Sequence, residues 1–473
     1  MTAPQVKRTL TAGLLAAIFA ALPLFHVLRP VDNALADRLY QHEEALTGDV
    51  VLIGIDQRAL ETLGPFSSWG RGVLAQAIEM LNADPENCPA VIGIDTIFAG
   101  ETDPEKDAAL TAAAGRRGNV VLASAAQFGT EVEDDGDGFS LNSAAITALD
   151  EPFPALREVT EQGHINAMYD TDGILRHAIL QLELPDGRTL PSFHYQLAAR
   201  YAAQTGQTLS PPPTDEKFRW YLPYSALPGG FDDGFSVADL LAGDLPAPLF
   251  AGKIVLIGPY AAGLNDTVTT SIDHAAPMYG VEFQANAVTA LLAGDFQREV
   301  SSVPQAILLF LMALFCLFWF RDRKILSATV SWLLLTGASV GGAWLCFSGG
   351  YVVSVLYFPL TVTVLYIGSV AGNYVRAALE KRRVTATFQR YVAPEIVREI
   401  LREGSDSLSL GGKLTDIAVL FVDIRGFTTM SELLEPAQVV EILNRYLTLT
   451  STCIFQNGGT LDKFVGDCTM AFW

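Results

Sequence analysis

Residues 417–428 read IAVLFVDIRGFT, in which an apolar run of six residues is followed at once by Asp423. An apolar run of this length beside turn residues predicts a buried strand that ends at the aspartate. A second motif, LDKFVGD at residues 461–467, ends a later apolar segment on Asp467. The intervening pattern predicts a helix from about Pro436 to Phe455. The sequence therefore places one carboxylate at the end of each of two apolar segments.

Both motifs closely resemble the start of the catalytic domain of class III adenylate and guanylate cyclases, where the second motif forms a hairpin. The resemblance implies a ferredoxin-like α+β fold, of which residues 413–473 cover roughly the first third. It also implies that a second adenine-selecting residue and the family's transition-state Asn and Arg lie beyond Trp473. Because these residues are missing, we expect the 473-residue chain alone to be inactive. We also expect that the cyclase domain is truncated, since a chain that ends inside an apolar strand leaves a sheet edge exposed.

The carboxylate pair is suited to metal-dependent cyclisation of a nucleoside triphosphate. The reaction deprotonates a 3′-hydroxyl and releases pyrophosphate, and two divalent cations can assist both events. Such hard cations prefer carboxylate and backbone oxygens. The resemblance implies that Asp423 and Asp467 are catalytic and hold two Mg or Mn ions, with the Ile424 carbonyl as an added ligand. The expected triphosphate-binding turn consists of Gly426, Phe427 and Thr428, because glycine permits close backbone approach.

Lys463 bears on the choice of base. A lysine can donate to N1 of adenine, whereas N1 of guanine carries a proton and requires an acceptor. In the family that the motifs resemble, Lys at this position marks adenylate cyclases, Glu marks guanylate cyclases, and the lysine acts across a homodimer interface. We therefore expect an adenylate cyclase that uses ATP. The alternatives are a guanylate cyclase and a non-enzymatic membrane receptor with a vestigial cyclase segment.

The composition indicates a membrane protein, because 50% of the 473 residues are hydrophobic and the mean hydropathy is +0.29. A helix needs about 20 apolar residues to cross a bilayer. The predicted fold class is a multidomain membrane protein with an α/β extracytoplasmic sensor domain, four transmembrane helices and the N-terminal part of a ferredoxin-like α+β cyclase domain. The expected transmembrane helices are 9–28, 300–320, 325–347 and 351–375.

Basic residues beside the apolar segments predict the orientation in the membrane. Lys7 and Arg8, the loop at 321–324, and the basic stretch after residue 375 fall on one side if the chain crosses four times, and that side is expected to be cytosolic. The expected location is the bacterial inner membrane. An alternative is that the first segment is a signal peptide cleaved after Ala36, but the segment is longer than a usual signal-peptide core. The remaining expected regions are a cytosolic N-terminus (1–8), the extracytoplasmic sensor (29–299), a cytosolic helical connector (376–412) and the cytosolic cyclase segment (413–473).

Charge and cysteine content exclude some functions. The net charge is −21, and most of the acidic residues lie in the predicted sensor, which argues against nucleic acid as a partner. Of the five cysteines, Cys88 alone lies in that segment, so the sequence predicts no disulfide framework.

The sensor segment alternates short apolar runs with helix-length stretches. Alternation of this kind predicts an α/β domain with a largely parallel sheet. Asp56 and Asp95 each end a predicted strand, so they either face a ligand crevice or cap the turns that follow. The expected strands are 50–55, 90–94, 120–123 and 254–258, and the expected helices are 71–82 and 106–114.

An ordered set of motifs in this segment resembles the second type of CHASE domain, an extracellular sensory module found ahead of bacterial cyclases and kinases. The motifs are VLIGID at 51–56, VIGID at 91–95, GHIN at 163–166, DTDGILR at 170–176 and VLIG at 255–258. The resemblance implies reception of an extracytoplasmic signal of unknown identity.

The most polar part of the sensor segment is a candidate ligand site. His164 and Asn166 lie close in sequence to Asp170 and Asp172, although such residues are often structural. The sensor ligand candidates are thus Asp56, Asp95, His164 and Asn166.

The connector is expected to transmit signals between domains of a homodimer. Residues 388–397 resemble the segment that precedes many membrane-tethered bacterial cyclase domains. A helix is expected through Val392, followed by a short helix at 395–402 and a Ser- and Gly-rich linker at 404–412.

Overall fold

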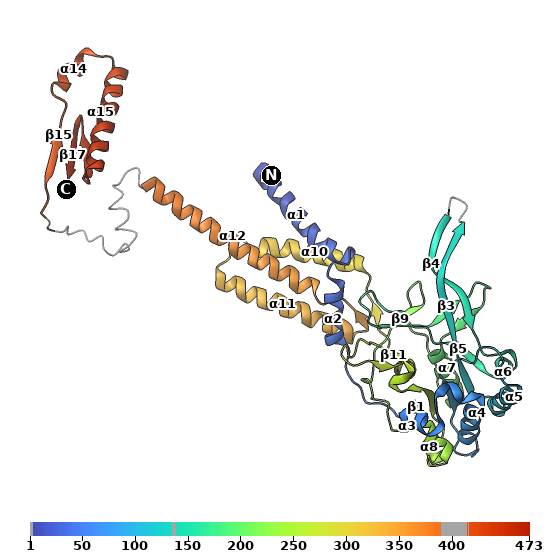
Figure 1. The fold of residues 1–473 in the computed structure, drawn as a ribbon. Coiled ribbons are helices and arrows are strands. Elements are labelled where there is room, and N and C mark those ends of the chain that lie inside the picture. Colours follow the sequence, from blue (N-terminus) through green and yellow to red (C-terminus); the bar gives the residue numbers. More distant parts are fainter. Residues whose placement is uncertain (1–2, 135–138, 389–413, 415) are drawn as a thin grey trace. The chain divides into compact units, whose positions relative to one another are not determined.

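A computed structural model of the chain describes residues 3–134, 139–388, 414 and 416–473 (Figure 1). The described residues fall into two compact units, Met1–Tyr366 and Ile367–Trp473. The first unit holds the predicted sensor domain, the apolar helices before residue 357 and the start of the helix at 357–388, and the second unit holds the rest of that helix and the cyclase-like segment. The predicted helix end at Val392, the helix at 395–402 and the linker at 404–412 lie outside the described residues.

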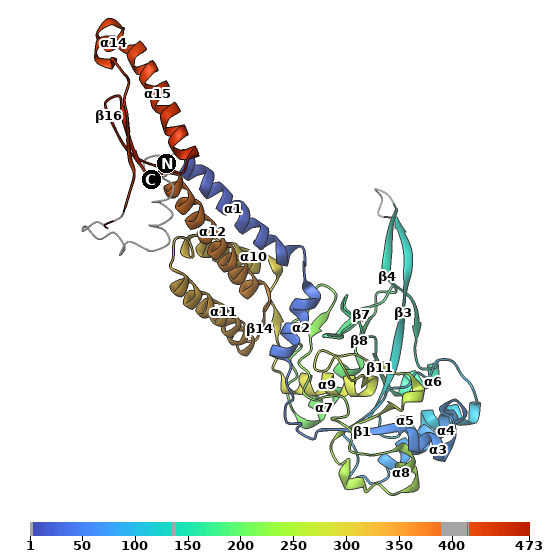
Figure 2. The same ribbon diagram turned by 60° about the vertical axis from the view of Figure 1, so that its left-hand side comes forward.

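The sensor domain is built on a mixed sheet whose centre is parallel. The sheet runs in the order β1, β10, β2, β3, β4, and β5 pairs with β3 as well. All neighbours pair in parallel except β3 and β4, which form a long antiparallel hairpin that projects beyond the sheet (Figures 1 and 2). The predicted parallel α/β architecture is therefore confirmed. The strands are β1 (Val50–Asp56), β2 (Val91–Ile94), β3 (Val120–Asp134), β4 (Phe139–Asp150), β5 (Glu161–His164) and β10 (Ile254–Tyr260).

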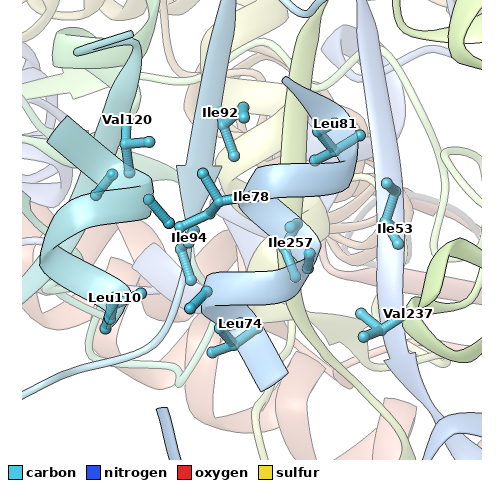
Figure 3. Close-up of a cluster of buried hydrophobic side chains, with 14 of the residues drawn as sticks. Ile53, Leu74, Ile78, Leu81, Ile92, Ile94, Leu110, Val120, Val237 and Ile257 are labelled. Atoms are coloured by element: carbon cyan, nitrogen blue, oxygen red, sulfur yellow. The ribbon is translucent and has the colours of Figure 1, made fainter. Parts of the chain in front are cut away.

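Helices cover both faces of this sheet because alternate strand residues point to opposite faces. On one face, Ile53, Ile94 and Ile257 pack with Ile78 and Leu110 of the covering helices (Figure 3). On the other face, Leu52 and Leu256 pack against Phe193 and Leu197. The helices predicted at 71–82 and 106–114 are confirmed. The first face carries α3 (Gln57–Leu63), α4 (Gly70–Leu81), α5 (Pro104–Gly115), α6 (Pro154–Val159) and α8 (Val237–Ala242); the second carries α7 (Phe193–Thr205) and α9 (Gly280–Ala293).

Short strand pairs complete the domain. Some of them join neighbouring segments and others join segments that lie far apart in sequence, and one pair adjoins the apolar helices. The pairs are β6 (His177–Ile179) with β9 (Arg219–Tyr221), β7 (Gln181–Glu183) with β8 (Thr189–Pro191), β11 (Thr267–Val268) with β12 (Met278–Tyr279), and β13 (Arg298–Glu299) with β14 (Tyr351–Val352).

Among the described residues, three helices are long and apolar enough to cross a membrane, and a fourth crossing arises if the bent pair α1 (Ala3–Leu24) and α2 (Arg29–Tyr40) counts as one span. The other three are α10 (Ser302–Trp319), α11 (Ile325–Ser348) and α12 (Tyr357–Phe388). The predicted segments 300–320 and 325–347 match α10 and α11 closely.

The other two predicted membrane segments were wrong in their bounds. Helix α1 ends at Leu24 instead of Leu28, and α2 follows at an angle of 70°. His26 and Leu28 adopt left-handed backbone angles (φ 53° and 63°), which an α-helix cannot include. The segment predicted at 351–375 begins as β14, and the helix starts only at Tyr357 and continues to Phe388. The apolar helix and the first part of the predicted connector are therefore one helix.

Beyond the rest of α12, the described residues of the second unit form a small antiparallel sheet and the helices α14 and α15. Strand β17 lies between β15 and β16, with Val422 opposite Thr469. The predicted strand before Asp423, the predicted long helix and the hairpin are confirmed. The elements are β15 (Val419–Val422), α14 (Phe427–Leu433), α15 (Pro436–Gln456), β16 (Thr460–Val465) and β17 (Cys468–Phe472).

Candidate metal site and sensor charge clusters

Asp423 and Asp467 meet at one end of the small sheet. Asp423 directly follows β15, and Asp467 lies in the turn between β16 and β17. Because β17 pairs antiparallel with β15, this turn lies beside the end of β15. A hydrogen bond between the two carboxyl groups raises the pKa of Asp423. The two carboxylates predicted from separate motifs are therefore in contact.

The surroundings of the pair fit a divalent cation that also binds substrate. The amide of Ile424 donates to Oδ1 of Asp423 (3.1 Å), and its carbonyl accepts from the amide of Phe427 (3.2 Å). No group of three His, Cys, Asp or Glu side chains able to hold a metal occurs among the described residues. Two carboxylates and one carbonyl suit Mg or Mn, which often retain positions for water and phosphate oxygens.

Tyr446 of α15 is a further residue beside the pair, and the sequence motifs gave no signal for it. Burial raises the pKa of Tyr446, and the charges of Asp423, Cys468 and Asp467 raise it further. The hydroxyl is buried and has no hydrogen-bond partner among the described residues. Tyr446 is therefore a buried hydroxyl that the charges of the carboxylate pair influence.

The other predicted cyclase residues lie on the adjoining turn and hairpin. Gly426 has a left-handed backbone (φ 74°) and precedes α14, so Phe427 and Thr428 open that helix. Lys463 lies on β16, where the pairing with β17 is interrupted by an irregularity. Its side chain is 60% exposed, and its Nζ lies 3.4 Å from Asp462.

The four ligand candidates in the sensor have separate environments. Asp56 accepts from the amide of Ala59 (2.8 Å) and the hydroxyl of Ser236 (2.6 Å), so it caps α3, as the capping alternative proposed. Asn166 forms two hydrogen bonds with the backbone of Ala126. His164 is fully buried, which lowers its pKa to about 3 and keeps the ring neutral.

The remaining candidate, Asp95, is a buried acid and not a cap. Its side chain is only 6% exposed, and its amide donates to the carbonyl of Ile257 (2.8 Å). Burial, together with the charge of Asp266, raises the pKa of Asp95 to about 8. Burial raises the pKa of Asp266 as well. Asp95 is therefore protonated at neutral pH.

Replacing Asp95 by Asn is expected to make folding stability less dependent on pH. The folded protein holds this proton more tightly than the unfolded chain, whose aspartates ionise near pH 4. The contribution of Asp95 is thus fully present below about pH 4 and is lost as the pH rises through about 8. Between pH 5 and pH 8, the free energy of unfolding of the wild type should fall by up to about 4 kcal/mol more than that of the variant. Thermal unfolding of the full chain in detergent measures this, with the exposed Asp244→Asn as control; parallel pH profiles would contradict the assignment.

The charged residues near His164 instead gather around Arg176. This side chain is 5% exposed and forms ion pairs with Asp170, Asp172 and the distant Asp37. The predicted polar cluster is thus divided, because His164 is buried in the core and Asn166 is hydrogen-bonded to the backbone of Ala126. The participation of Asp37, which lies 139 residues from Arg176, was not predicted.

The first unit thus combines an α/β domain that has a charged interior with apolar helices of membrane-spanning length. A family model of the CHASE2 domain matches residues 11–319. Because the match spans more than half of the chain, the protein belongs to the CHASE2 domain family, and it is a membrane protein with an extracellular sensor.

Comparisons with curated proteins confirm the resemblance to adenylate cyclases. The chain is 34% identical over 115 residues to "Adenylate cyclase" of Anabaena cylindrica, covering 23% of each chain. It is 37% identical over 90 residues to "Adenylate cyclase 1" of Rhizobium meliloti, covering 18% of this chain and 13% of that one. A solved structure of a bacterial light-regulated adenylyl cyclase is 27% identical over 22% of this chain and 29% of its own, with a TM-score of 0.18. The chain therefore spans less than a quarter of the length of these two curated relatives.

Proposed function

We propose that this protein is a receptor-type adenylate cyclase, or the sensor-bearing part of one. It would convert ATP to cyclic AMP and pyrophosphate at a homodimer interface under the control of an extracytoplasmic signal. The observation that carries this proposal is the contact between Asp423 and Asp467. The similarity to proteins named adenylate cyclase supports it.

We assign separate roles in metal binding and triphosphate binding to the residues of this site. Asp423, Asp467 and the Ile424 carbonyl would hold two divalent cations, which supply charge neutralisation and activation of the 3′-hydroxyl. The amides of Gly426, Phe427 and Thr428 would orient the triphosphate, because these residues open α14 near the strand end. The Phe427 amide would exchange its hydrogen bond with the Ile424 carbonyl for one with the triphosphate.

The membrane arrangement is part of the proposal. With α1 and α2 as one crossing, the chain would cross the inner membrane four times, with the cyclase segment in the cytosol. The basic loop between α10 and α11, at residues 321–324, supports this orientation by the excess of positive charge in cytosolic loops.

Lys463→Glu is expected to lower kcat/KM for ATP by about 100-fold, because a carboxylate cannot donate to adenine N1 and would leave a buried acceptor unpaired. The protein expressed from its complete gene should be assayed with Mn²⁺ and with ATP or GTP as substrate. The exposed Arg445→Glu, on α15, serves as the control for a charge reversal in the same unit. Unchanged ATP kinetics in Lys463→Glu would remove Lys463 from base recognition.

A further inference from the structure

Arg176 binds three carboxylates at once. Its Nε and Nη2 donate to Asp37 at 3.0 and 2.8 Å, and Nη1 and Nη2 donate to the two oxygens of Asp172 at 2.8 and 2.9 Å. Nη1 also donates to Asp170 at 2.9 Å. A guanidinium keeps its charge at all relevant pH values, and paired donation to carboxylates fixes its orientation. Arg176 is therefore a permanent link between the sensor and Asp37 of α2.

His177 provides a second cationic contact directly beside the first. Its Nδ1 lies 3.4 Å from Asp170, and its Nε2 lies 3.0 Å from Glu299 of β13. The ring of Tyr221 on β9 packs edge-on against it at 6.1 Å. Burial lowers the pKa of His177, but the ion pair with Asp170 and the hydrogen bond to Glu299 outweigh burial and raise it to about 9. The ring is therefore charged at neutral pH.

The first contact leads to the start of α12 through α2. Five residues before Asp37, the carboxylate of Asp32 accepts from the amides of Val355 (2.9 Å) and Leu356 (2.7 Å). These are the last two residues before α12 begins at Tyr357. One short helix thus carries the sensor's arginine contact at one end and the backbone of the α12 entry at the other.

The second contact leads to the same place through a strand pair. Glu299 belongs to β13, which pairs in parallel with β14. The amide of Arg298 donates to Gly350 (2.9 Å), and the amide of Val300 donates to Val352 (2.9 Å). Arg176 and His177 therefore each bind a segment, α2 or β13, that is also hydrogen-bonded to the backbone within residues 350–356.

We propose that Arg176 and His177 form the joint through which the sensor domain positions the entry of α12, with Asp37 and Glu299 as its two contacts. This goes beyond cyclase activity, because it concerns how the sensor reaches the helix that continues into the connector. The two positioning residues act through α2 and β13.

The contact of His177 with Glu299 depends on pH, whereas the contact of Arg176 with Asp37 does not depend on the titration of His177. The groups around His177 are Asp170 and Arg176 on its own segment, Tyr221 on β9 and Glu299 on β13, and Arg29 of α2 acts on Glu299. Because the pKa of His177 is raised, its stabilising interaction is complete below about pH 6.5 and is lost as the pH rises through about 9. Glu299 is half exposed and can then turn to solvent, whereas Asp37 stays bound to Arg176.

Hydrogen exchange of the full chain in detergent, followed by mass spectrometry, tests the joint without requiring cyclase activity. Asp37→Asn leaves Arg176 paired with Asp170 and Asp172, so the domain is expected to stay folded. Amides 355 and 356 should lose protection at least about tenfold, while the amides of β1 and β10 keep theirs. Arg176→Gln should show the same loss. The control is Arg188→Gln, which removes only the exposed ion pairs with Glu151 and Asp186.

Hydrogen exchange measured at a series of pH values tests whether the charge of His177 holds β13 in place. In the wild type, the protection factors of amides 298 and 300 should fall between pH 7.5 and pH 10, while those of 355 and 356 should change less. In His177→Gln the protection at 298 and 300 should already be low at pH 7.5 and should not vary with pH. Unchanged protection at 355 and 356 in Asp37→Asn, or the same pH profile in wild type and His177→Gln, would overturn the proposal. If Arg176→Gln does not fold, Asp37→Asn alone tests whether the contact between Arg176 and Asp37 protects amides 355 and 356.

Discussion

Asp467→Asn is expected to lower the rate of cyclic AMP formation at least 100-fold, because loss of even an outer-shell partner of a metal commonly costs about 10- to 100-fold. Asp467 contacts Asp423 directly, and the two carry the negative charge that a cation pair would neutralise. An asparagine keeps the shape but removes one of these charges. Asp423→Asn should have an effect of similar size, because both carboxylates are proposed ligands of the same ions.

Mn²⁺ binding and product formation check this prediction together. Electron paramagnetic resonance of the wild type and both variants should show weaker Mn²⁺ binding in each variant in the presence of ATP. The matched control is Glu441→Gln, which removes a carboxylate from the exposed surface of α15. Wild-type Mn²⁺ binding and wild-type rates in Asp467→Asn would contradict the metal assignment.

Gly163→Ala is expected to destabilise the sensor by at least 3 kcal/mol, at or above the upper end of the usual ~1–3 kcal/mol for overpacking. A Cβ on Gly163 would lie 2.4 Å from Cα and 2.5 Å from the amide nitrogen of Phe193. These are backbone atoms at the start of α7, so a side-chain rotation cannot relieve the clash. Strand β5 and α7 would have to separate, and Phe193 is fully buried in the core.

Thermal unfolding of the full chain measures the effect. A loss of 3 kcal/mol corresponds to a fall in Tm of roughly 10 °C for a domain of this size. Gly263→Ala is the control, because its added Cβ would meet nothing within 4 Å. Equal Tm values for the two variants would show that β5 and α7 can separate at little cost.

Local sequence patterns were sufficient for the core of the fold. The strands β2 and β10, the first six residues of β1 and the start of β3 at residues 120–123 are almost wholly apolar, as expected for parallel strands buried on both faces. The carboxylate pair was also predictable, because each aspartate ends an apolar segment. The role of Gly163 within the GHIN motif was not, since it depends on the approach of Phe193.

The errors arose where long-range contacts or special backbone angles decide the structure. The apolar run at 9–28 gives no sign of the left-handed residues His26 and Leu28 that end α1. Tyr351 and Val352 are apolar enough for a membrane helix but form β14, because β13 offers them a pairing partner. Asp56 and Asp95 end strands in similar motifs, yet one caps a helix and the other is buried without such a role.

The pairing of Arg176 with Asp37 shows the same limit more clearly. Each residue is polar and unremarkable in its local sequence, and 139 positions separate them. A single sequence does not show which charges will share a buried site. The structure brings them together because α2 packs beside the loop that precedes β6.

The most direct test of the account is the cyclic nucleotide made by the protein expressed from its complete gene, in membranes, with Mn²⁺ and either ATP or GTP. The account predicts cyclic AMP from ATP, far less cyclic GMP from GTP, and neither product from Asp467→Asn. Absence of both products in the wild type would contradict the enzyme assignment and favour a receptor whose cyclase segment is vestigial. Preferential formation of cyclic GMP would contradict the proposed role of Lys463.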